Sequence, residues 1–329
     1  MHNEVLVISE DIVKDLVTIE DAMKAVEEVL SEKAHRRVQM PPKTYIYFKQ
    51  YEGDFRTMPS YIQGTNKAGV KIVNVHPNNP LKYHKPVVMA TIVLINPVTG
   101  APIAIIAATA ITAMRTGAIG GIATKYLARK SSTTLGLVGA GTQARTQLLA
   151  ISKILPLEEV RVYDKFSNKV RSFIEYSRPY HDLTFIPCDN LEDCVTDADV
   201  ISTITPVTTP IVENNWISLG THINAIGADA PGKEELDPKI LQRAKIVVDD
   251  YEQATHSGEI NVPLSKGYLT LDNIHGELSE VVAQKITGRE SEDEITVFDS
   301  TGLSLQDIAT ATIVFERAKQ SNRGQWIRL

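Results

Sequence analysis

The chain has 329 residues, with 34 Lys and Arg against 40 Asp and Glu, so its formal net charge is −6 at pH 7. This length suffices for two domains of ordinary size that each bury a core. The charge excludes a typical nucleic-acid-binding protein, because it provides no excess of cations to neutralise phosphates. Cys188 and Cys194 match neither a disulfide framework nor a zinc spacing. We therefore expect no metal site, and two reduced thiols in the cytoplasm.

The N-terminus, MHNEVLVISED, lacks a basic segment followed by an apolar run, so we expect no signal peptide. A stretch without charged residues, from Val87 to Met114, is long enough to suggest a membrane span. The turn-forming segment from Asn96 to Gly100 divides this stretch into halves that are too short to cross as helices. Both halves are rich in Val, Ile, Thr and Ala, which predicts a buried β-hairpin over 87–112 and no contact with a membrane.

Residues 1–118 open with helical spacing. Thr18 followed by Asp21 predicts an N-terminal cap. An apolar stripe at helical period comes next and contains Ala22, Val26, Val29 and Leu30. Strand-like segments follow at 44–48 and 69–75, before the hairpin. Strands joined by short turns predict an antiparallel or mixed sheet, and hence an α+β domain.

From residue 119 the pattern changes to alternating strands and helices. Helices are expected at 143–154 and 167–176, and apolar strands at 133–141, 159–164, 183–189, 198–205, 221–229 and 244–250. The alternation predicts an α/β fold over 119–302, with a doubly wound parallel sheet covered on both faces. A last strand at 294–302 precedes an apolar helix at 303–319, which could return to the first domain.

A dinucleotide-binding pattern stands at the first strand-to-helix junction of this region. Gly139-Ala-Gly141-Thr-Gln-Ala144 has the form G-x-G-x-x-A, follows the apolar strand LGLV and opens an amphipathic helix. Gly139 would allow the tight turn, Gly141 the approach of a pyrophosphate, and Ala144 the packing of helix on strand. Backbone N–H groups at the helix start would then hold the phosphate charge. The alternative is a glycine turn without a ligand.

Asp164 ends the next strand, 25 residues after Gly139. This spacing is close to the ~20 residues expected for the acid that binds the ribose of a dinucleotide. A carboxylate accepts hydrogen bonds from both ribose hydroxyls and repels a 2′-phosphate, so NAD is favoured. Lys165 follows directly, and for this reason NADP is not excluded.

Six segments in order along the chain resemble the ornithine cyclodeaminase/μ-crystallin family, which includes archaeal-type alanine dehydrogenases. They are MPSYI (58–62), GVKIVNVHPNNP (69–80), ITAMRTGAIGG (111–121), GAGTQA (139–144), INAIGADAPGKEELD (223–237) and ITVFDSTGLSLQD (295–307). The resemblance implies a homodimer of two-domain subunits. A discontinuous domain, 1–118 with 303–329, would serve dimerisation and substrate binding, and a Rossmann domain, 119–302, would bind NAD.

The resemblance also implies two catalytic residues. Lys71 lies in the apolar segment GVKIV, and an ammonium there would stabilise negative charge that develops on the substrate. From the sequence alone, Lys71 could equally be an edge-strand lysine that faces solvent. Asp229 ends an apolar strand, where an aspartate is more often a turn or capping residue. In the family pattern it is the acid/base group for the substrate nitrogen or a water.

Three further cations are implied in substrate binding. Arg115 would serve the substrate carboxylate and the cofactor with its bidentate guanidinium, although it could also close a helix at the surface. Lys43 and Arg56 could each be solvated, but together they could hold an α-carboxylate. The cofactor-binding set that follows from the pattern and the resemblance comprises Arg115, Gly139, Gly141, Thr142, Gln143, Asp164, Lys165, Thr205, Ala225, Ile226, Gly227 and Ser300.

One position departs from the family pattern. Family members that cyclise ornithine carry a glutamate two residues before the Met-Pro, and this chain has Arg56 there. A cation at this position suits a carboxylate better than a substrate with a second ammonium. We therefore expect an NAD-dependent dehydrogenase of L-alanine. The alternatives are an ornithine cyclodeaminase, a cyclic ketimine reductase and, less favoured because Lys71 and Asp229 are both present, a non-enzymatic dinucleotide-binding protein like the crystallin branch.

Overall fold

The computed structural model describes residues 4–329. These residues form two compact units: unit 1 comprises the described chain up to Arg115 together with Leu303–Leu329, and unit 2 comprises Thr116–Gly302. The chain passes from unit 1 to unit 2 within helix α4 (Thr109–Leu127), directly after Arg115. Among the described residues, no helix combines the length and the apolar character that a membrane crossing requires.

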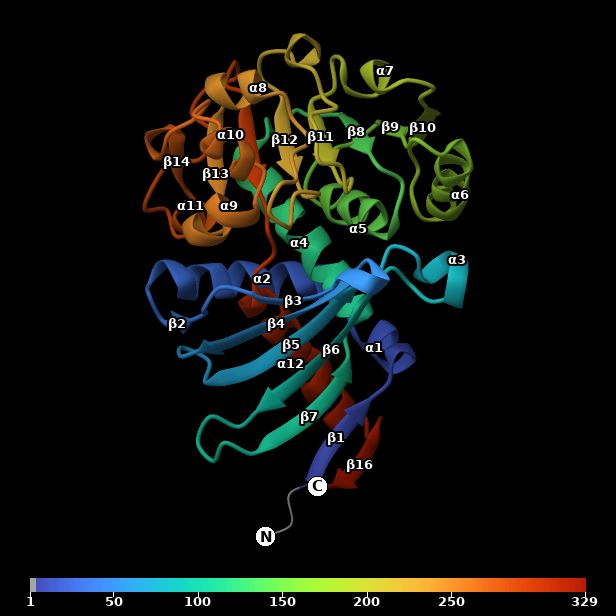
Figure 1. Cartoon of the computed structure of the whole chain (residues 1–329), viewed down its shortest axis with the longest axis vertical. Coiled ribbons are helices and arrows are strands. Elements are labelled where there is room, and N and C mark those ends of the chain that lie inside the picture. Colours follow the sequence, from blue (N-terminus) through green and yellow to red (C-terminus); the bar gives the residue numbers. More distant parts are fainter. Residues whose placement is uncertain (1–3) are drawn as a thin grey trace. The chain divides into compact units, whose positions relative to one another are not determined.

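Unit 1 is built on a mixed, mostly antiparallel sheet in the order β16-β1-β7-β6-β5-β4-β2, with β3 paired to β4 (Figure 1). Its strands are β1 (Glu4–Ile8), β2 (Val38–Gln39), β3 (Thr44–Phe48), β4 (Gly53–Ile62), β5 (Lys67–Val75), β6 (Val88–Ile95), β7 (Pro102–Ala107) and β16 (Gln325–Arg328). Its helices are α1 (Glu10–Leu16), α2 (Ile19–Ala34), α3 (Asn79–Tyr83) and α12 (Ser304–Gln320). The sequence did not predict β16, which pairs with β1 and so joins the two ends of the chain.

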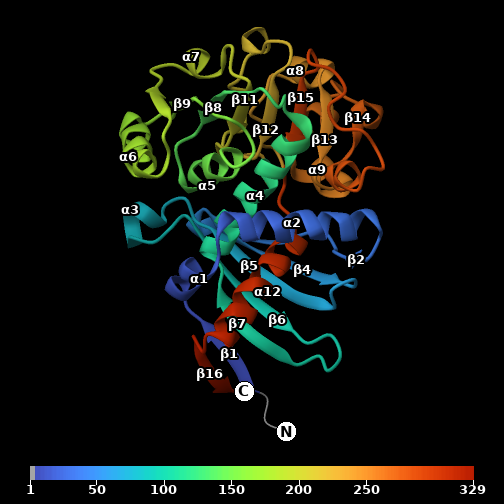
Figure 2. The same ribbon diagram turned by 180° about the vertical axis from the view of Figure 1, so that it is seen from behind.

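Helix α12 lies across one face of this sheet, against β4, β5 and β6 (Figure 2). Apolar residues from both chain ends form the core there, because Met58, Ile92 and Ile106 of the sheet pack with Ile308 and Val314 of the helix. α2 packs on α12, and its predicted cap is confirmed: the Thr18 hydroxyl accepts from Asp21 N at 3.2 Å, and the Asp21 carboxylate accepts from Thr18 N at 3.1 Å.

The predicted hairpin is confirmed as β6 and β7, which pair in antiparallel fashion. It is shorter than expected, however, because the chain is helical from Thr109 onward. The segment after β7 is rich in Ala, which favours a helix over a strand. The hairpin is also buried on one face only, since alternate residues of β6 and β7 keep part of their surface exposed.

Unit 2 contains an all-parallel sheet in the order β10-β9-β8-β11-β12-β15-β13-β14, which confirms the doubly wound α/β fold. Its strands are β8 (Thr134–Val138), β9 (Glu159–Tyr163), β10 (Thr184–Pro187), β11 (Val200–Thr203), β12 (His222–Ala225), β13 (Lys245–Val248), β14 (Ile274–Glu277) and β15 (Thr296–Asp299). Its helices are α5 (Thr142–Ile151), α6 (Ser167–Ser177), α7 (Leu191–Val195), α8 (Pro238–Arg243), α9 (Tyr251–Ser257), α10 (Asn261–Ser265) and α11 (Leu278–Val282). α5 ends three residues before the predicted boundary at 154.

Both faces of the parallel sheet carry an apolar core. Leu137 and Val200 belong to one cluster, whereas their neighbours Val138 and Ile201 belong to the other. Successive side chains of a strand point to opposite faces, so each face is covered. The order of the strands reverses between β8 and β11, and doubly wound sheets bind ligands at the carboxyl ends of the strands beside such a reversal.

Candidate functional site

The glycine loop follows β8 at this reversal. Gly139 has a φ of 107°, in the left-handed region, and its N–H donates to Tyr163 O at 2.8 Å. A Cβ at this position would stand 3.0 Å from Ile204 O, so both conformation and space require glycine. At Gly141 a Cβ would meet no heavy atom within 4 Å. Gly141 is also the N-cap residue of α5 and gives it no side-chain cap, so an anion has room to approach the first turn.

Asp164, at the end of β9, is attached to this loop. One carboxylate oxygen accepts from Ala140 N and the other from Phe166 N, each at 3.0 Å. Asp164 and Lys165 line a pocket of unit 2 whose wall also carries Arg171, Arg178, Cys188 and Asp189. The structure thus brings together the glycine loop, Asp164 and Lys165. It adds two arginines that the sequence analysis did not consider.

The loops after β11 and β12 share one buried carboxylate that the sequence analysis did not identify. Glu235 accepts from the backbone N and the hydroxyl of Thr205, both at 2.7 Å, and from Gly227 N at 3.0 Å. Its side chain is fully buried, and burial raises its pKa against the effect of these hydrogen bonds. Glu235 therefore connects Thr205 and Gly227, two of the predicted cofactor-binding residues. Two others, Ala225 and Ile226, lie at the carboxyl end of β12 and directly after it.

The segment after β15 is held in a similar way. The Asp249 carboxylate accepts from Thr301 N at 2.7 Å and from Gly302 N at 2.8 Å, and the Ser300 hydroxyl lies 3.5 Å from it. Gly302 has a φ of 80°, which lets the chain turn away from the sheet. Ser300 thus stands at the carboxyl edge of the parallel sheet, in a turn that a buried acid fixes.

Asp229 follows β12 and is about one-third exposed, with its Oδ1 2.6 Å from Lys233 Nζ. The partner lysine stands four residues later in the sequence, and the sequence analysis did not single it out. The two side chains form an ion pair that spans one helical-turn spacing in the sequence.

In unit 1, Lys71 projects from β5 into the face covered by α12 and is fully buried. Its Nζ lies 2.6 Å from Asp307 Oδ2 on α12, and Arg115 Nε donates to the other oxygen of Asp307 at 2.9 Å. Arg115 Nη1 also donates to Gln306 Oε1 at 3.3 Å. The two cations therefore converge on a carboxylate that the sequence analysis missed. The surface-exposed alternatives for Lys71 and Arg115 are wrong.

Burial lowers the pKa of Lys71 to about 7, because a buried ammonium loses its hydration. The positive charges of Arg115 and Lys43 contribute to this lowering, and the Asp307 carboxylate opposes it; the pKa of about 7 is the combined result. Lys43 therefore lies within electrostatic reach of Lys71. A lysine with a pKa near neutrality is typical of functional sites.

Arg56 of β4 is nearly buried, as a substrate-binding residue can be, but it already has an acidic partner. Its Nε and Nη2 donate to the two carboxylate oxygens of Asp54 at 3.2 and 3.0 Å. Its guanidinium also stands over the Tyr45 ring, 5.1 Å from the centroid. Asp54 offsets part of the positive charge on which the sequence argument for this position relied.

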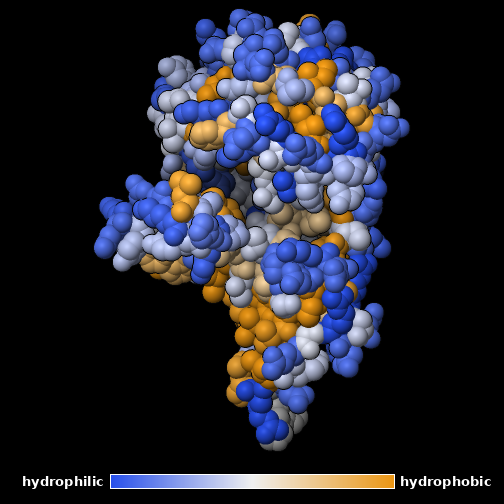
Figure 3. Space-filling model, turned by 90° about the vertical axis from the view of Figure 1, so that its right-hand side faces the viewer, coloured by the Kyte–Doolittle hydropathy of each residue, from blue (hydrophilic) through white to orange (hydrophobic). Residues whose placement is uncertain are grey.

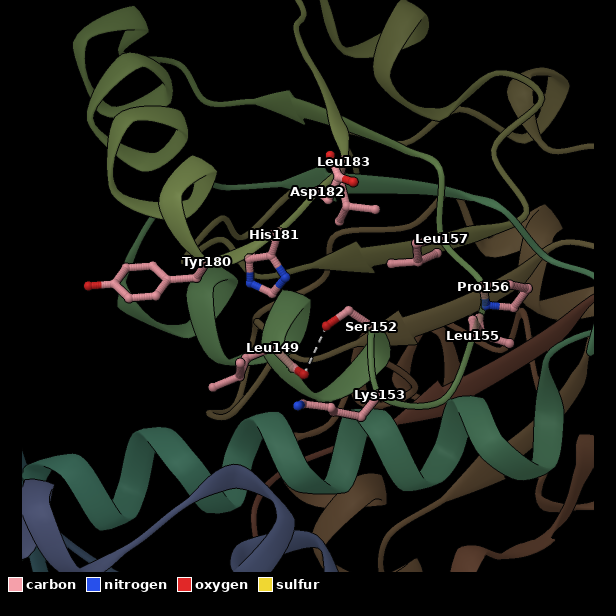
Figure 4. A pocket seen from close by; sticks show the side chains of 10 residues that line it. All are labelled: Leu149, Ser152, Lys153, Leu155, Pro156, Leu157, Tyr180, His181, Asp182 and Leu183. Carbon is pink, nitrogen blue, oxygen red and sulfur yellow. Dashed lines mark hydrogen bonds between the residues drawn. The ribbon is translucent and has the colours of Figure 1, made fainter.

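A second pocket of unit 2 is lined by Leu149, Ser152, Lys153, Leu155, Pro156, Leu157, Tyr180, His181, Asp182 and Leu183 (Figure 4). None of the predicted site residues is among them. Burial and the charge of Lys153 lower the pKa of His181, and the Ser152 hydroxyl donates to Leu149 O at 3.1 Å. The pocket lies apart from the strand ends that carry the predicted cofactor residues.

Comparisons with known proteins agree along the whole chain. The model of the ornithine cyclodeaminase/mu-crystallin family matches residues 3–322. Alanine dehydrogenase of Archaeoglobus fulgidus is 46% identical over 326 residues, which cover 99% of this chain and 98% of that protein. A solved archaeal alanine dehydrogenase dimer with bound NAD has a TM-score of 0.95 at 46% identity and 99% coverage of both chains. The Δ1-pyrroline-2-carboxylate reductase of Thermococcus litoralis, solved with NADH and L-proline, has a TM-score of 0.95 at 35% identity, with 98% of this chain and 99% of that chain covered.

The lowered pKa of Lys71 predicts a pH dependence of stability. Between its folded-state pKa of about 7 and the ordinary value of 10.5, the unfolded chain holds a proton that the folded chain has released. Raising the pH through this window therefore stabilises the folded state. Lys71→Met removes the effect, so the wild type should gain stability relative to the variant as the pH rises from about 7 to about 10.

Urea unfolding at several pH values measures this difference. Lys67→Met, at a partly exposed lysine of the same strand that pairs with Glu316, controls for the loss of a lysine side chain from β5. A difference between wild type and Lys71→Met that stays constant with pH would show that Lys71 keeps an ordinary pKa in the folded state.

Proposed function

Because this chain belongs to the ornithine cyclodeaminase/mu-crystallin family, we propose that it is an NAD-dependent dehydrogenase that converts L-alanine to pyruvate and ammonia and catalyses the reverse reaction. The observation that carries this proposal is the similarity, over the full length of both chains, to an alanine dehydrogenase. The buried cations of unit 1 and the glycine loop of unit 2 supply the chemical groups that such a reaction needs.

The residues of unit 2 fit a dinucleotide. The open space in front of Gly141 and the uncapped start of α5 suit a pyrophosphate, with Thr142 and Gln143 in the first turn. Asp164 would bind the adenosine ribose, beside Lys165, and Thr205, Ala225, Ile226, Gly227 and Ser300 would line the nicotinamide end. When bound, NAD supplies the acceptor for the hydride from the substrate α-carbon. The carboxylate of Asp164 disfavours a 2′-phosphate, which is the reason to propose NAD rather than NADP.

The residues of unit 1 fit an α-amino or α-keto acid. Arg115, with Lys43 and Arg56, would bind the substrate carboxylate, and the Lys71 ammonium would stabilise negative charge at the reacting carbon. From unit 2, Asp229 would exchange protons with the substrate nitrogen or with the water that hydrolyses the imine. Its ion pair with Lys233 would orient the carboxylate for this exchange.

A second candidate is a cyclic ketimine reductase. The similarity to the Δ1-pyrroline-2-carboxylate reductase favours it, because this substrate also carries a carboxylate next to a C=N bond. Both activities would use the same cations. A third outcome, cyclisation of ornithine, would place a second ammonium near Arg56, whose positive charge disfavours it although Asp54 offsets part of that charge.

We further propose a homodimer that forms through the outer face of the unit 1 sheet. A row of apolar residues crosses four strands on this face, where Pro59, Val70, Val93 and Ile105 stand opposite one another. All four keep part of their surface exposed, and Figure 3 shows apolar residues gathered on the surface of unit 1. A contiguous apolar patch of this kind is typical of a subunit interface. The similar alanine dehydrogenase was solved as a dimer. The cytoplasmic location predicted from the sequence stays a prediction.

The activity is tested by following NADH absorbance with a panel of substrates. We expect alanine-dependent formation of NADH, and we expect Lys71→Ala and Asp229→Ala each to abolish turnover while NAD binding stays within a few-fold of the wild type. Production of proline from ornithine without accumulating NADH would instead identify a cyclodeaminase. Preferential NADH consumption with Δ1-pyrroline-2-carboxylate would identify the reductase. NAD binding without turnover of any substrate would point to a non-enzymatic protein.

The two glycines of the loop should respond differently to substitution. Gly141→Ala adds a methyl group that meets nothing in the protein, so we expect normal stability and NAD binding weakened by about tenfold or more, because the methyl group occupies the approach of the pyrophosphate. Gly139→Ala forces a side chain into a left-handed conformation and should destabilise the fold by about 1 kcal/mol or more. Thermal unfolding and calorimetric titration with NAD separate the two effects. Unchanged NAD affinity in Gly141→Ala would exclude the loop as the pyrophosphate site.

The dimer is tested by placing a charge on the outer face. Ile72 lies on this face and is 36% exposed. Ile72→Asp should convert the dimer into a monomer, because dimerisation would bury the carboxylate against an apolar surface. Leu81→Asp, at an 86% exposed residue of α3, is the matched control. Light scattering coupled to size-exclusion chromatography gives the mass. A dimer that survives Ile72→Asp would locate the interface elsewhere.

A further inference from the structure

Asp307 of α12 lies between Lys71 and Arg115, the two cations that would bind the substrate in the proposed function. Its side chain and that of Lys71 are fully buried, and the Arg115 side chain is 9% exposed. Each carboxylate oxygen serves one cation, because Oδ2 lies 2.6 Å from Lys71 Nζ and Oδ1 lies 2.9 Å from Arg115 Nε. The two contacts connect β5 and α4 through a single residue of α12.

Asp307 is the carboxylate that lies against Lys71, whose other neighbours are cations or apolar residues. Three charged groups shift the pKa of Lys71 by their electrostatic interaction with it: Arg115 of α4 and Lys43 before β3 are cations, and Asp307 is an anion. The residues paired with Lys71 on the neighbouring strands are Met58 of β4 and Ile92 of β6, and both are apolar. Arg56 stands two residues before Met58 on β4, so it lies on the same face. Arg56 has its own carboxylate partner, Asp54, on the same strand face. Lys71 and Arg115 share Asp307, so the loss of its charge would leave both of these buried cations without this carboxylate.

A glycine of β5 allows α12 to pack closely on the sheet beside Lys71. Gly69 precedes Lys71 by two residues on the same face of β5. A Cβ at Gly69 would stand 2.5 Å from Val93 O and 2.8 Å from Ile308 Cδ1. A larger residue at this position would clash with the backbone of β6 and force Ile308, the neighbour of Asp307 on α12, to repack.

We propose that Asp307 is a positioning residue, whose carboxylate keeps Lys71 in its ammonium form and orients Arg115 for the substrate carboxylate. This inference rests on the proposed function, because that function defines what Lys71 and Arg115 bind. A lysine close to half-protonated at neutral pH depends on its partner for its charge. A neutral amine at this position could not stabilise negative charge on the substrate.

The opposing interpretation is that Asp307 only fastens α12 to the sheet. The two interpretations differ in their pH dependence. A purely structural role predicts an equal loss of activity at every pH when Asp307 is changed. A positioning role predicts that the basic limb of the kcat/KM profile, which reports the loss of the Lys71 proton in the free enzyme, moves to lower pH.

The test compares wild type, Asp307→Asn and Asp307→Glu over about pH 5 to 9, with alanine and NAD or, if it is the better substrate, with Δ1-pyrroline-2-carboxylate and NADH. Asp307→Asn keeps the size of the side chain and removes its charge. We expect its basic limb to move down by about one pH unit, which lowers kcat/KM about tenfold on that limb. Asp307→Glu should restore part of this shift, and NAD affinity should stay within about twofold in all three proteins. A limb that does not move, whether activity falls or not, would overturn the proposal.

A second measurement does not depend on turnover. The unfolding free energies of Asp307→Asn and of the double variant Asp307→Asn/Lys71→Met are compared across the same pH range. If Asp307 keeps Lys71 charged, its loss lowers the folded-state pKa of Lys71, and the pH at which Lys71 begins to affect stability falls below that of the wild type. An unchanged onset would refute the proposal. If no substrate turned over, the proposed function would fail, while this titration would still decide whether Asp307 keeps Lys71 protonated.

Discussion

The structure of unit 1 depends on compensating the charge of the Lys71 ammonium group, which is fully buried in its core. A charge removed from water costs several kcal/mol unless an opposite charge and hydrogen bonds replace the hydration shell. β5 places the lysine among apolar neighbours on the strands beside it, so the compensating anion must come from another element. α12 supplies it as Asp307, and the same carboxylate also neutralises Arg115. α12 thus belongs to unit 1, although the whole of unit 2 precedes it in the sequence.

In unit 2, buried carboxylates likewise compensate polar groups, here the N–H groups of the backbone. The strand ends that would meet the cofactor consist of short turns whose N–H groups need acceptors. Glu235 satisfies N–H groups after β11 and β12, Asp249 those after β15, and Glu259 accepts from Glu235 N and Leu236 N in turn. Burial raises the pKa of Glu259 well above its ordinary value, and the negative charge of Glu235 adds to this effect. The edge of the parallel sheet is therefore preorganised by acids that lie behind it.

The sequence predicts those features that depend on neighbouring residues. Gly139, Gly141 and Asp164 follow from a local pattern, as do the parallel sheet and the capping box of Thr18. Several partners of the site residues were missed, although most of them left a signal in the sequence. Gln306 and Asp307 are consecutive polar residues between the apolar Leu305 and Ile308 at the start of α12. Asp54 lies two residues before Arg56, on the same strand face, and Lys233 lies four residues after Asp229. Glu235 has no such signal, because its partners Thr205 and Gly227 belong to separate loops.

The antiparallel pairing of β1 with β16 also bears on how the protein is made. A ribosome releases the middle of the chain before the final helix and strand, so the parallel sheet can complete its core during translation. The sheet of unit 1 must wait until α12 has been synthesised, because this helix covers it and follows the whole of unit 2 in the sequence. Until then its hydrophobic face stays open and the internal lysine lacks a counter-ion. Unit 1 is therefore the part of the nascent chain that would be most prone to aggregation and most dependent on chaperones.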